Sequence, residues 1–202
     1  MIISIVIPAF NEAKYLPNTL KAIKNSNRVF NSVGWESEIV VCDNNSTDAT
    51  SKIATENGAR VVFEPFNQIS SARNSAAQAA KGDWLVFVDA DTQVSAELFR
   101  AMMRAIVSGN CIGGGAPVKF DNGPWLACQT VHIWNALAKI MSWAAGSFLF
   151  CNANAFRKID GFNTDLFAAE EVEYCERLKR FGKRSAKRLI MLRPSVVTSG
   201  RK

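Results

Sequence analysis

Four short apolar runs in the first half of the chain are each followed by a stretch with helical spacing, and this alternation is the strongest constraint on the fold. The runs are residues 2–8, 37–43, 59–65 and 83–92, and the helical stretches are residues 12–26, 46–58, 69–82 and 95–109. Strands separated by helices of this length form βαβ units, in which helices cover both faces of a parallel sheet. The sequence therefore predicts an α/β protein with a mainly parallel central sheet.

The alternation weakens after Gly109, but nothing marks the remainder as a separate domain. Residues 111–120 have the pattern of one more strand, and a long apolar stretch and a final charged helix follow. No low-complexity linker and no internal repeat interrupts the 202 residues. A chain of this length suits one sizeable α/β domain. We therefore expect a single domain over residues 1–202, with two halves, 1–109 and 110–202.

Two aspartates follow the fourth apolar run, where their charges require a positive partner. Trp84–Val88 is wholly apolar, and Asp89 and Asp91 come next, two residues apart. In an extended chain, such residues point to the same side. Ligands of open parallel sheets bind at the carboxyl ends of the strands. Two carboxylates that converge there suit a hard divalent cation, which in turn binds phosphate oxygens.

Other common nucleotide-site motifs are missing. The chain has no Gly-x-x-x-x-Gly-Lys-[Ser/Thr] loop and no Gly-x-Gly-x-x-Gly after its first strand, and Gly113–Gly115 lead into a strand rather than a helix. These absences argue against P-loop kinases and dinucleotide-binding dehydrogenases. His132 is the sole histidine and lies in a helical apolar region, so a Ser–His or Cys–His nucleophile has little support.

The final charged helix, residues 167–182, places a carboxylate on its apolar side. Glu171 shares a face with the apolar residues four and seven positions later. The helix dipole accounts for Glu170 in the first turn, but it does not require Glu171 to face inward. Glu173 and Arg177 are expected to form an ordinary exposed pair. A partly buried Glu171 beside a cleft is a candidate general base, whose pKa burial would raise and the helix terminus would lower.

Charge and cysteine content narrow the partners only coarsely. The 24 Lys and Arg residues exceed the 18 Asp and Glu residues by six, which favours anionic partners such as nucleotide phosphates or acidic membrane surfaces. Much of this excess lies in residues 177–195, which form either a solvated helix face with its loop or a surface facing anionic lipid. The five cysteines have no metal-type spacing and indicate reduced, buried thiols in a cytosolic protein.

No segment of the sequence has the pattern of a membrane span or a signal peptide. Residues 1–10 have the pattern of a first strand and lack a basic leader. Trp125–Phe150 is apolar, but His132, Asn135 and Lys139 interrupt it. It is expected to form a core helix, or alternatively an amphipathic helix on a surface. The expected location is the cytoplasm, with a peripheral position at the inner face of the membrane as the alternative.

Four stretches together make the chain similar to glycosyltransferase family 2, the inverting nucleotide-sugar transferases of the GT-A fold. They are SIVIPAFNEAKYL, VVCDNNSTDAT, SARNSAAQAAKGDWLVFVDADT and GFNTDLFAAEEVEYCERLKRFG, and the resemblance runs from Ile3 to Gly182. It implies a nucleotide-binding half over residues 1–109 and an acceptor-side half over residues 110–202. The implied reaction moves a sugar, with inversion, from a nucleotide-diphosphate donor (a UDP-sugar is expected) to a hydroxyl of a saccharide or lipid-linked acceptor. A place in cell envelope polysaccharide synthesis is expected, and no nucleic-acid partner.

The resemblance also implies a role for each matching residue. Asp89 matches the aspartate that touches the donor ribose, and Asp91 the one that holds a divalent metal, Mn²⁺ or Mg²⁺, against the diphosphate. The other matching nucleotide-binding positions are Pro8, Phe10, Glu12, Asp43 and Arg73. Of these, Asp43 is expected at the base and Arg73 near the base and phosphates. Glu171 falls at the general base of the family's Glu-Asp motif.

The chain departs from the family pattern in three places. Glu171 stands where the family usually has aspartate, "GFNTD" replaces the commoner "GFDE", and the late histidine of some relatives is absent or lies beyond Lys202. Ser199 and Arg201 are candidate diphosphate contacts. Two other functions stay open: a nucleotidyltransferase, for which the first loop lacks the glycine- and basic-rich pattern, and a non-catalytic sugar-nucleotide-binding module.

Overall fold

The computed structural model describes residues 1–121, 143–144 and 146–200, and its centre is a seven-stranded sheet in the order β3-β2-β1-β4-β8-β6-β9. Its first four strands in the chain are β1 (Ile2–Ala9), β2 (Glu36–Asp43), β3 (Arg60–Phe63) and β4 (Trp84–Val88). They run parallel, with β1 between β2 and β4. The predicted mainly parallel sheet is therefore confirmed, and its strands come from the four apolar runs of the sequence.

The second half of the chain adds strands of mixed direction. They are β6 (Cys111–Gly115), β8 (Phe148–Asn152) and β9 (Arg188–Met191). Strand β8 is antiparallel to both β4 and β6, whereas β9 is parallel to β6. Strand β6 contains glycines because its neighbours approach closely: a Cβ on Gly114 would collide with the carbonyl oxygen of Ile190.

The prediction of one strand over residues 111–120 is wrong. Strand β6 ends at Gly115, and β7 (Val118–Phe120) belongs to a second sheet. Pro117 lies between the two and has no N–H to donate to a strand ladder. The second sheet has the order β5-β10-β7, with β5 (Thr92–Gln93) and β10 (Val196–Thr198) as its other strands.

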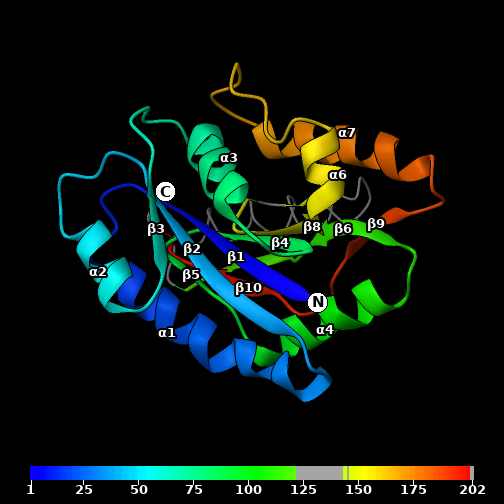
Figure 1. The fold of residues 1–202 in the computed structure, drawn as a ribbon, viewed down its shortest axis with the longest axis horizontal. Coiled ribbons are helices and arrows are strands. Elements are labelled where there is room, and N and C mark those ends of the chain that lie inside the picture. Colours follow the sequence, from blue (N-terminus) through cyan, green and yellow to red (C-terminus); the bar gives the residue numbers. More distant parts are fainter. Residues whose placement is uncertain (122–142, 145, 201–202) are drawn as a thin grey trace.

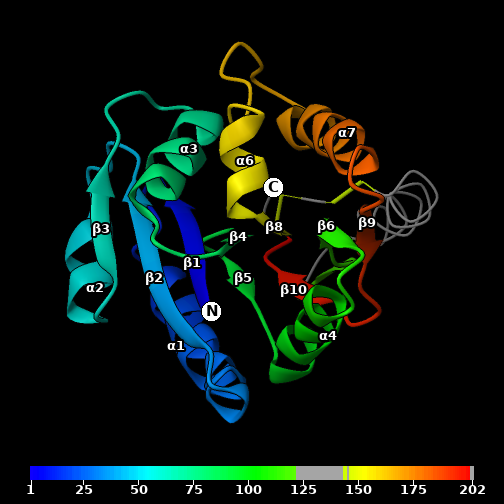
Figure 2. The ribbon, with the colours of Figure 1, turned by 45° about the vertical axis from the view of Figure 1, so that its right-hand side comes forward.

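Helices cover both faces of the large sheet, so the molecule has three layers (Figure 1). One face carries α1 (Leu16–Ser26), α2 (Thr50–Glu56) and α4 (Ala96–Val107), and the other carries α3 (Ile69–Ala79), α6 (Ala153–Lys158) and α7 (Glu170–Lys183). Figure 2 shows the same separation from a second direction. Two apolar cores result, because successive side chains of a strand point to opposite faces: Ile5 and Ile7 of β1 enter one core and Val6 enters the other.

The structure describes four of the five cysteines and a small part of the apolar stretch 125–150. Cys42, Cys111, Cys151 and Cys175 are free and buried, as expected. Cys128, His132, Arg201 and most of the stretch 125–150 lie outside the described residues. Within the residues that are described, no helix combines the length and the apolar character needed to cross a bilayer.

Candidate active site

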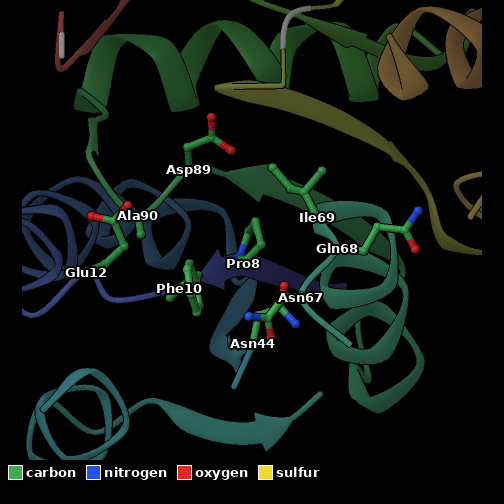
Figure 3. A pocket seen from close by; sticks show the side chains of 10 residues that line it. Pro8, Phe10, Glu12, Asn44, Asn67, Gln68, Ile69, Asp89 and Ala90 are labelled. Atoms are coloured by element: carbon green, nitrogen blue, oxygen red, sulfur yellow. The ribbon is translucent and has the colours of Figure 1, made fainter. Parts of the chain in front are cut away.

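A cavity of about 310 Å³ opens beyond the carboxyl ends of three parallel strands. Figure 3 shows the side chains at its wall, which are Pro8, Phe10, Glu12, Asn44, Asn67, Gln68, Ile69, Asp89 and Ala90. Pro8 is near the end of β1, Asn44 directly follows β2, and Asp89 directly follows β4. The sheet thus brings four of the predicted nucleotide-binding residues to one cavity, since parallel strands end at the same edge.

A second cavity, of about 460 Å³, adjoins the first. Asp89 and Ile69 line both. The other lining residues of the second cavity are Arg73, Val118, Phe120, Gly146, Ser147, Phe167, Ala169, Glu170, Glu171, Thr198 and Ser199. The two cavities therefore form one cleft with Asp89 at the junction, and the candidate general base lies in the second part.

Arg73 of α3 is buried between two carboxylates from distant segments. Its Nη1 lies 2.7 Å from Oε1 of Glu170, and its Nη2 lies 3.3 Å from Oδ1 of Asp89. The side chain is 2% exposed, and its guanidinium carbon stands 5.2 Å from the centre of the Phe162 ring. Gly146 leaves room for it, because a Cβ there would collide with Nη2. Arg73 thus lines the second cavity and ties it to the first, and its binding to a nucleotide stays a prediction.

Helix α7 begins with both glutamates, and Glu170 is the more deeply buried of the two. Glu170 is 5% exposed, whereas Glu171 is only half-buried. A helical wheel of one segment could not predict this, because the burial of Glu170 is compensated by Arg73, which lies 97 residues away in the sequence. Both glutamates line the second cavity.

The environment of Glu171 suits a proton acceptor. Burial raises the pKa of Glu171 above its ordinary value of 4.5, the charge of Glu170 raises it further, and Arg73 acts in the opposite direction. A general base works best when its pKa approaches the working pH, because it must be ionised yet hold a proton well. The sequence alone left open whether the pKa of Glu171 is raised or lowered, and in the structure it is raised.

Asp91 does not continue the strand that precedes it. Strand β4 ends at Val88, and the N–H of Thr92 donates to the carbonyl of Asp89 over 3.0 Å, which closes a turn. The extended geometry assumed for the two aspartates is therefore wrong. Asp91 is 7% exposed, and its Oδ1 accepts a hydrogen bond of 3.1 Å from Thr198 of β10.

Asp43 and Asn44, at the end of β2, have different surroundings. Asp43 is buried, and its Oδ1 accepts a 3.0 Å hydrogen bond from the N–H of Ser46. It is not among the residues that line either cavity, so its contact with a base stays a prediction. Asn44 lines the first cavity instead, with its side-chain amide held by the carbonyls of Glu64 and Phe66. Its signal in the sequence was its place directly after an apolar strand.

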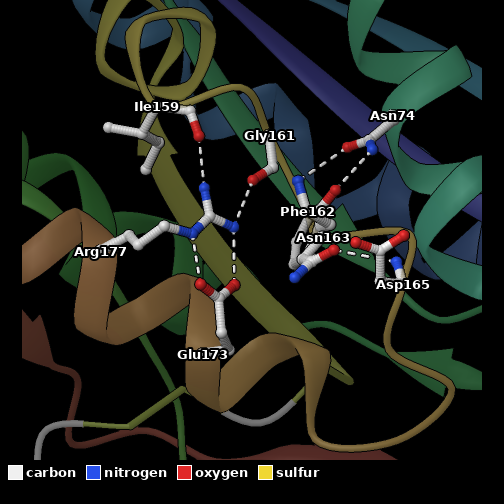
Figure 4. A network of polar contacts seen from close by, with 8 residues as sticks. All are labelled: Asn74, Ile159, Gly161, Phe162, Asn163, Asp165, Glu173 and Arg177. Carbon is white, nitrogen blue, oxygen red and sulfur yellow. Dashed lines mark hydrogen bonds and ion pairs between the residues drawn. The ribbon is translucent and has the colours of Figure 1, made fainter.

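Glu173 and Arg177 form more than the exposed pair expected from their spacing (Figure 4). Arg177 binds both carboxylate oxygens of Glu173, at 2.5 and 2.7 Å, and also donates to Gly161 O and to the carbonyl that follows α6. Both carbonyls belong to the loop that follows α6, so the arginine joins this loop to α7. Asn74 of α3 exchanges two hydrogen bonds with the backbone of Phe162 in the same loop. The loop therefore fixes α7, and with it Glu171, against α3 and α6.

This three-layer fold with a cleft at the strand ends is that of the GT-A nucleotide-sugar transferases. It superposes on TarS (residues 1–349) of S. aureus with a TM-score of 0.78 at 20% identity, over 98% of this chain and 60% of that one. A mannosyltransferase of Pyrobaculum calidifontis, solved with GDP-Man and Mn²⁺, gives 0.75 at 17% identity, over 98% and 56% of the two chains. Residues 4–162 match the model of Glycosyl transferase family 2, and the chain therefore belongs to that family.

Two relatives of known sequence match part of the chain, and one of them is named as a glycosyltransferase. An uncharacterised glycosyltransferase of Mycobacterium tuberculosis is 32% identical over 127 residues, which are 62% of this chain and 54% of the relative. A TPR repeat-containing protein of Synechococcus elongatus is 34% identical over 96 residues, which are 47% of this chain and 22% of that protein. The chain thus spans about half or less of the length of these relatives.

Proposed function

We propose that the chain transfers a sugar, with inversion, from a nucleotide-diphosphate donor to a hydroxyl acceptor. The observation that carries the proposal is the junction at Asp89, which lines the cavity at the strand ends and also the cavity that contains Glu171. A donor that spans the junction would have its nucleoside in the first cavity and its sugar beside a carboxylate in the second. A UDP-sugar is the proposed donor, supported by the complexes of TarS with UDP and with UDP-GlcNAc.

Asp91 is the proposed holder of Mn²⁺ or Mg²⁺. Its carboxylate fits such an ion, because these cations bind one or two protein carboxylates and complete their shell with water and substrate phosphates. Among the residues that the structure describes, no cluster of three or more His, Cys, Asp or Glu side chains is arranged to hold a metal. The bound cation would supply positive charge where the nucleoside diphosphate leaves.

Glu171 is the proposed general base. Its carboxylate would take the proton of the acceptor hydroxyl while the hydroxyl oxygen attacks the anomeric carbon and the bond to the diphosphate breaks. The acceptor would enter the second cavity, where Val118, Phe120 and Phe167 supply apolar surface. A saccharide or a lipid-linked hydroxyl is the proposed acceptor, which suits a role in cell envelope polysaccharide synthesis at the inner face of a membrane.

Calorimetric titration of UDP tests the donor site. UDP is expected to bind with Mn²⁺ present and at least about tenfold more weakly without it, because a cation held by Asp91 would attract the negatively charged diphosphate. Asp91→Ala should remove the effect of Mn²⁺ on the dissociation constant. Asp83→Ala is the matched control, since Asp83 directly precedes β4, at the opposite end of this strand from Asp91, and it should retain the effect. If the dissociation constant of UDP for the wild type were the same with and without Mn²⁺, the role of Asp91 would be refuted.

The pH dependence of donor turnover tests the electrostatics of Glu171. The charge of Glu170 raises the pKa of Glu171, so Glu170→Gln removes one cause of the increase. The acid limb of kcat/KM for UDP release should therefore move to lower pH. Glu176→Gln removes the same charge further along α7 and should leave the limb in place. A limb that moves to higher pH in Glu170→Gln would contradict the assignment.

A further inference from the structure

A hollow of about 340 Å³ lies where α6 ends against the last turns of α7, away from the cleft. Figure 1 shows the two helices side by side on the same face of the sheet. Four of the seven residues that line the hollow are basic: Lys158, Arg177, Arg180 and Arg184. Arg180 is nine residues beyond Glu171 on α7, a distance of about 14 Å along a helix axis. One phosphate cannot occupy both places.

The hollow has positive charge that the lining residues described by the structure neutralise only in part. Arg177 is paired with Glu173 and forms part of the wall (Figure 4). Asp160 is the one acidic residue of the lining, against the three cations that remain. A helix carboxyl end carries only about half a negative charge, so the ends of α6 and α7 offset about one charge more. A net positive charge therefore remains in the hollow.

Two arginines of the hollow repel each other. Arg180 is in the last turn of α7 and Arg184, four residues later, is its C-cap residue, and like charges at this helical spacing repel by a few tenths of a kcal/mol. Among the described residues no carboxylate forms an ion pair with either of them. Glu176, four residues before Arg180, makes its direct hydrogen bonds to Lys179 and the Trp143 ring nitrogen, and it acts on Arg180 only through its charge. A bound anion would turn this repulsion into attraction.

We propose that the hollow binds a phosphate group. Guanidinium groups match phosphate oxygens in pairs, and Lys158, the last residue of α6, adds a third cation. Half-buried Ile159 and Phe181 line the same hollow, so it also offers apolar surface beside the phosphate. A phospholipid headgroup and a free phosphate ester both have this chemistry, and the experiment below separates the two sources.

Titration of inorganic phosphate, followed by amide NMR shifts at constant ionic strength with EDTA present, tests the site. We expect saturable shifts at the end of α6 and the last turns of α7. The double variant R180Q/R184Q should weaken binding about tenfold or more, since it removes two charge-assisted contacts. R100Q/R104Q is the matched control, because these exposed arginines have the same spacing on α4 and should leave binding unchanged.

Co-sedimentation with vesicles distinguishes the sources. The vesicles contain phosphatidylglycerol and phosphatidylcholine. If the wild type and R100Q/R104Q sediment with them and R180Q/R184Q does not, the site binds a lipid headgroup. Phosphate binding without such vesicle binding would assign it to a free phosphate ester. Equal effects of the two double variants in both assays, or no saturable shift in the wild type, would overturn the proposal. Because EDTA removes the divalent metal, neither result depends on the donor site.

Discussion

Replacement of Glu171 with glutamine is expected to lower kcat about 10²–10⁴-fold, which is the effect of losing a positioned general base. Glutamine keeps the size of the side chain but cannot take a proton at neutral pH. The dissociation constant of UDP should stay unchanged, because Glu171 lines the second cavity and not the first. The measurement is steady-state UDP release from a UDP-sugar, with water or a hydroxyl compound as acceptor.

Glu176→Gln is the control for this experiment, since Glu176 is on the same helix but lines neither cavity. It should retain the wild-type kcat. If Glu171→Gln kept more than a tenth of the wild-type kcat, the base would be another group. If the wild-type protein bound UDP but did not cleave any UDP-sugar to UDP, the result would favour a non-catalytic binding module.

Replacement of Arg73 with methionine is expected to cost about 3–5 kcal/mol of the free energy of unfolding, the usual effect of removing one partner of a buried ion pair. The charge of Glu170 would then be buried without its partner, since its side chain is only 7% exposed. Urea unfolding followed by circular dichroism measures the loss. Lys52→Met is the control, because Lys52 is 76% exposed and should change stability by less than about 0.5 kcal/mol.

If Arg73→Met does not fold, a double variant still tests this prediction. Arg73→Met combined with Glu170→Gln removes the buried charge together with its partner, so part of the stability should return. A loss below about 1 kcal/mol in Arg73→Met alone would show that solvent reaches Glu170 and that the ion pair contributes little.

The sequence was sufficient for the parallel half of the sheet because each strand there is encoded locally. An apolar run of the right length followed by a helical pattern defined β1 to β4, and the end of each strand located the cleft. The break between β6 and β7 was missed, although Pro117 marks it. The position of β8, antiparallel between β4 and β6, could not be predicted, because no local sequence pattern indicates which strands pair with it.

The parts of the site that escaped prediction depend on contacts between distant segments. The bond between Thr198 and Asp91 joins residues 107 positions apart, and the ion pair of Arg73 with Glu170 joins residues 97 positions apart. A helical wheel assigns burial from one segment and contains no information on such partners. It therefore missed the burial of Glu170, although it placed a partly buried carboxylate, Glu171, at the start of α7.

Gln68 connects the two parts of the cleft physically. It lines the first cavity, and its side-chain amide donates to the carbonyls of Thr164 and Leu166, at 2.6 and 3.2 Å, in the segment that leads to α7. Under the proposed function, a nucleotide that contacts Gln68 would also steady the segment next to Phe167, which lines the acceptor cavity. The two substrates would then add in a compulsory order, with the nucleotide-sugar first and the hydroxyl compound second.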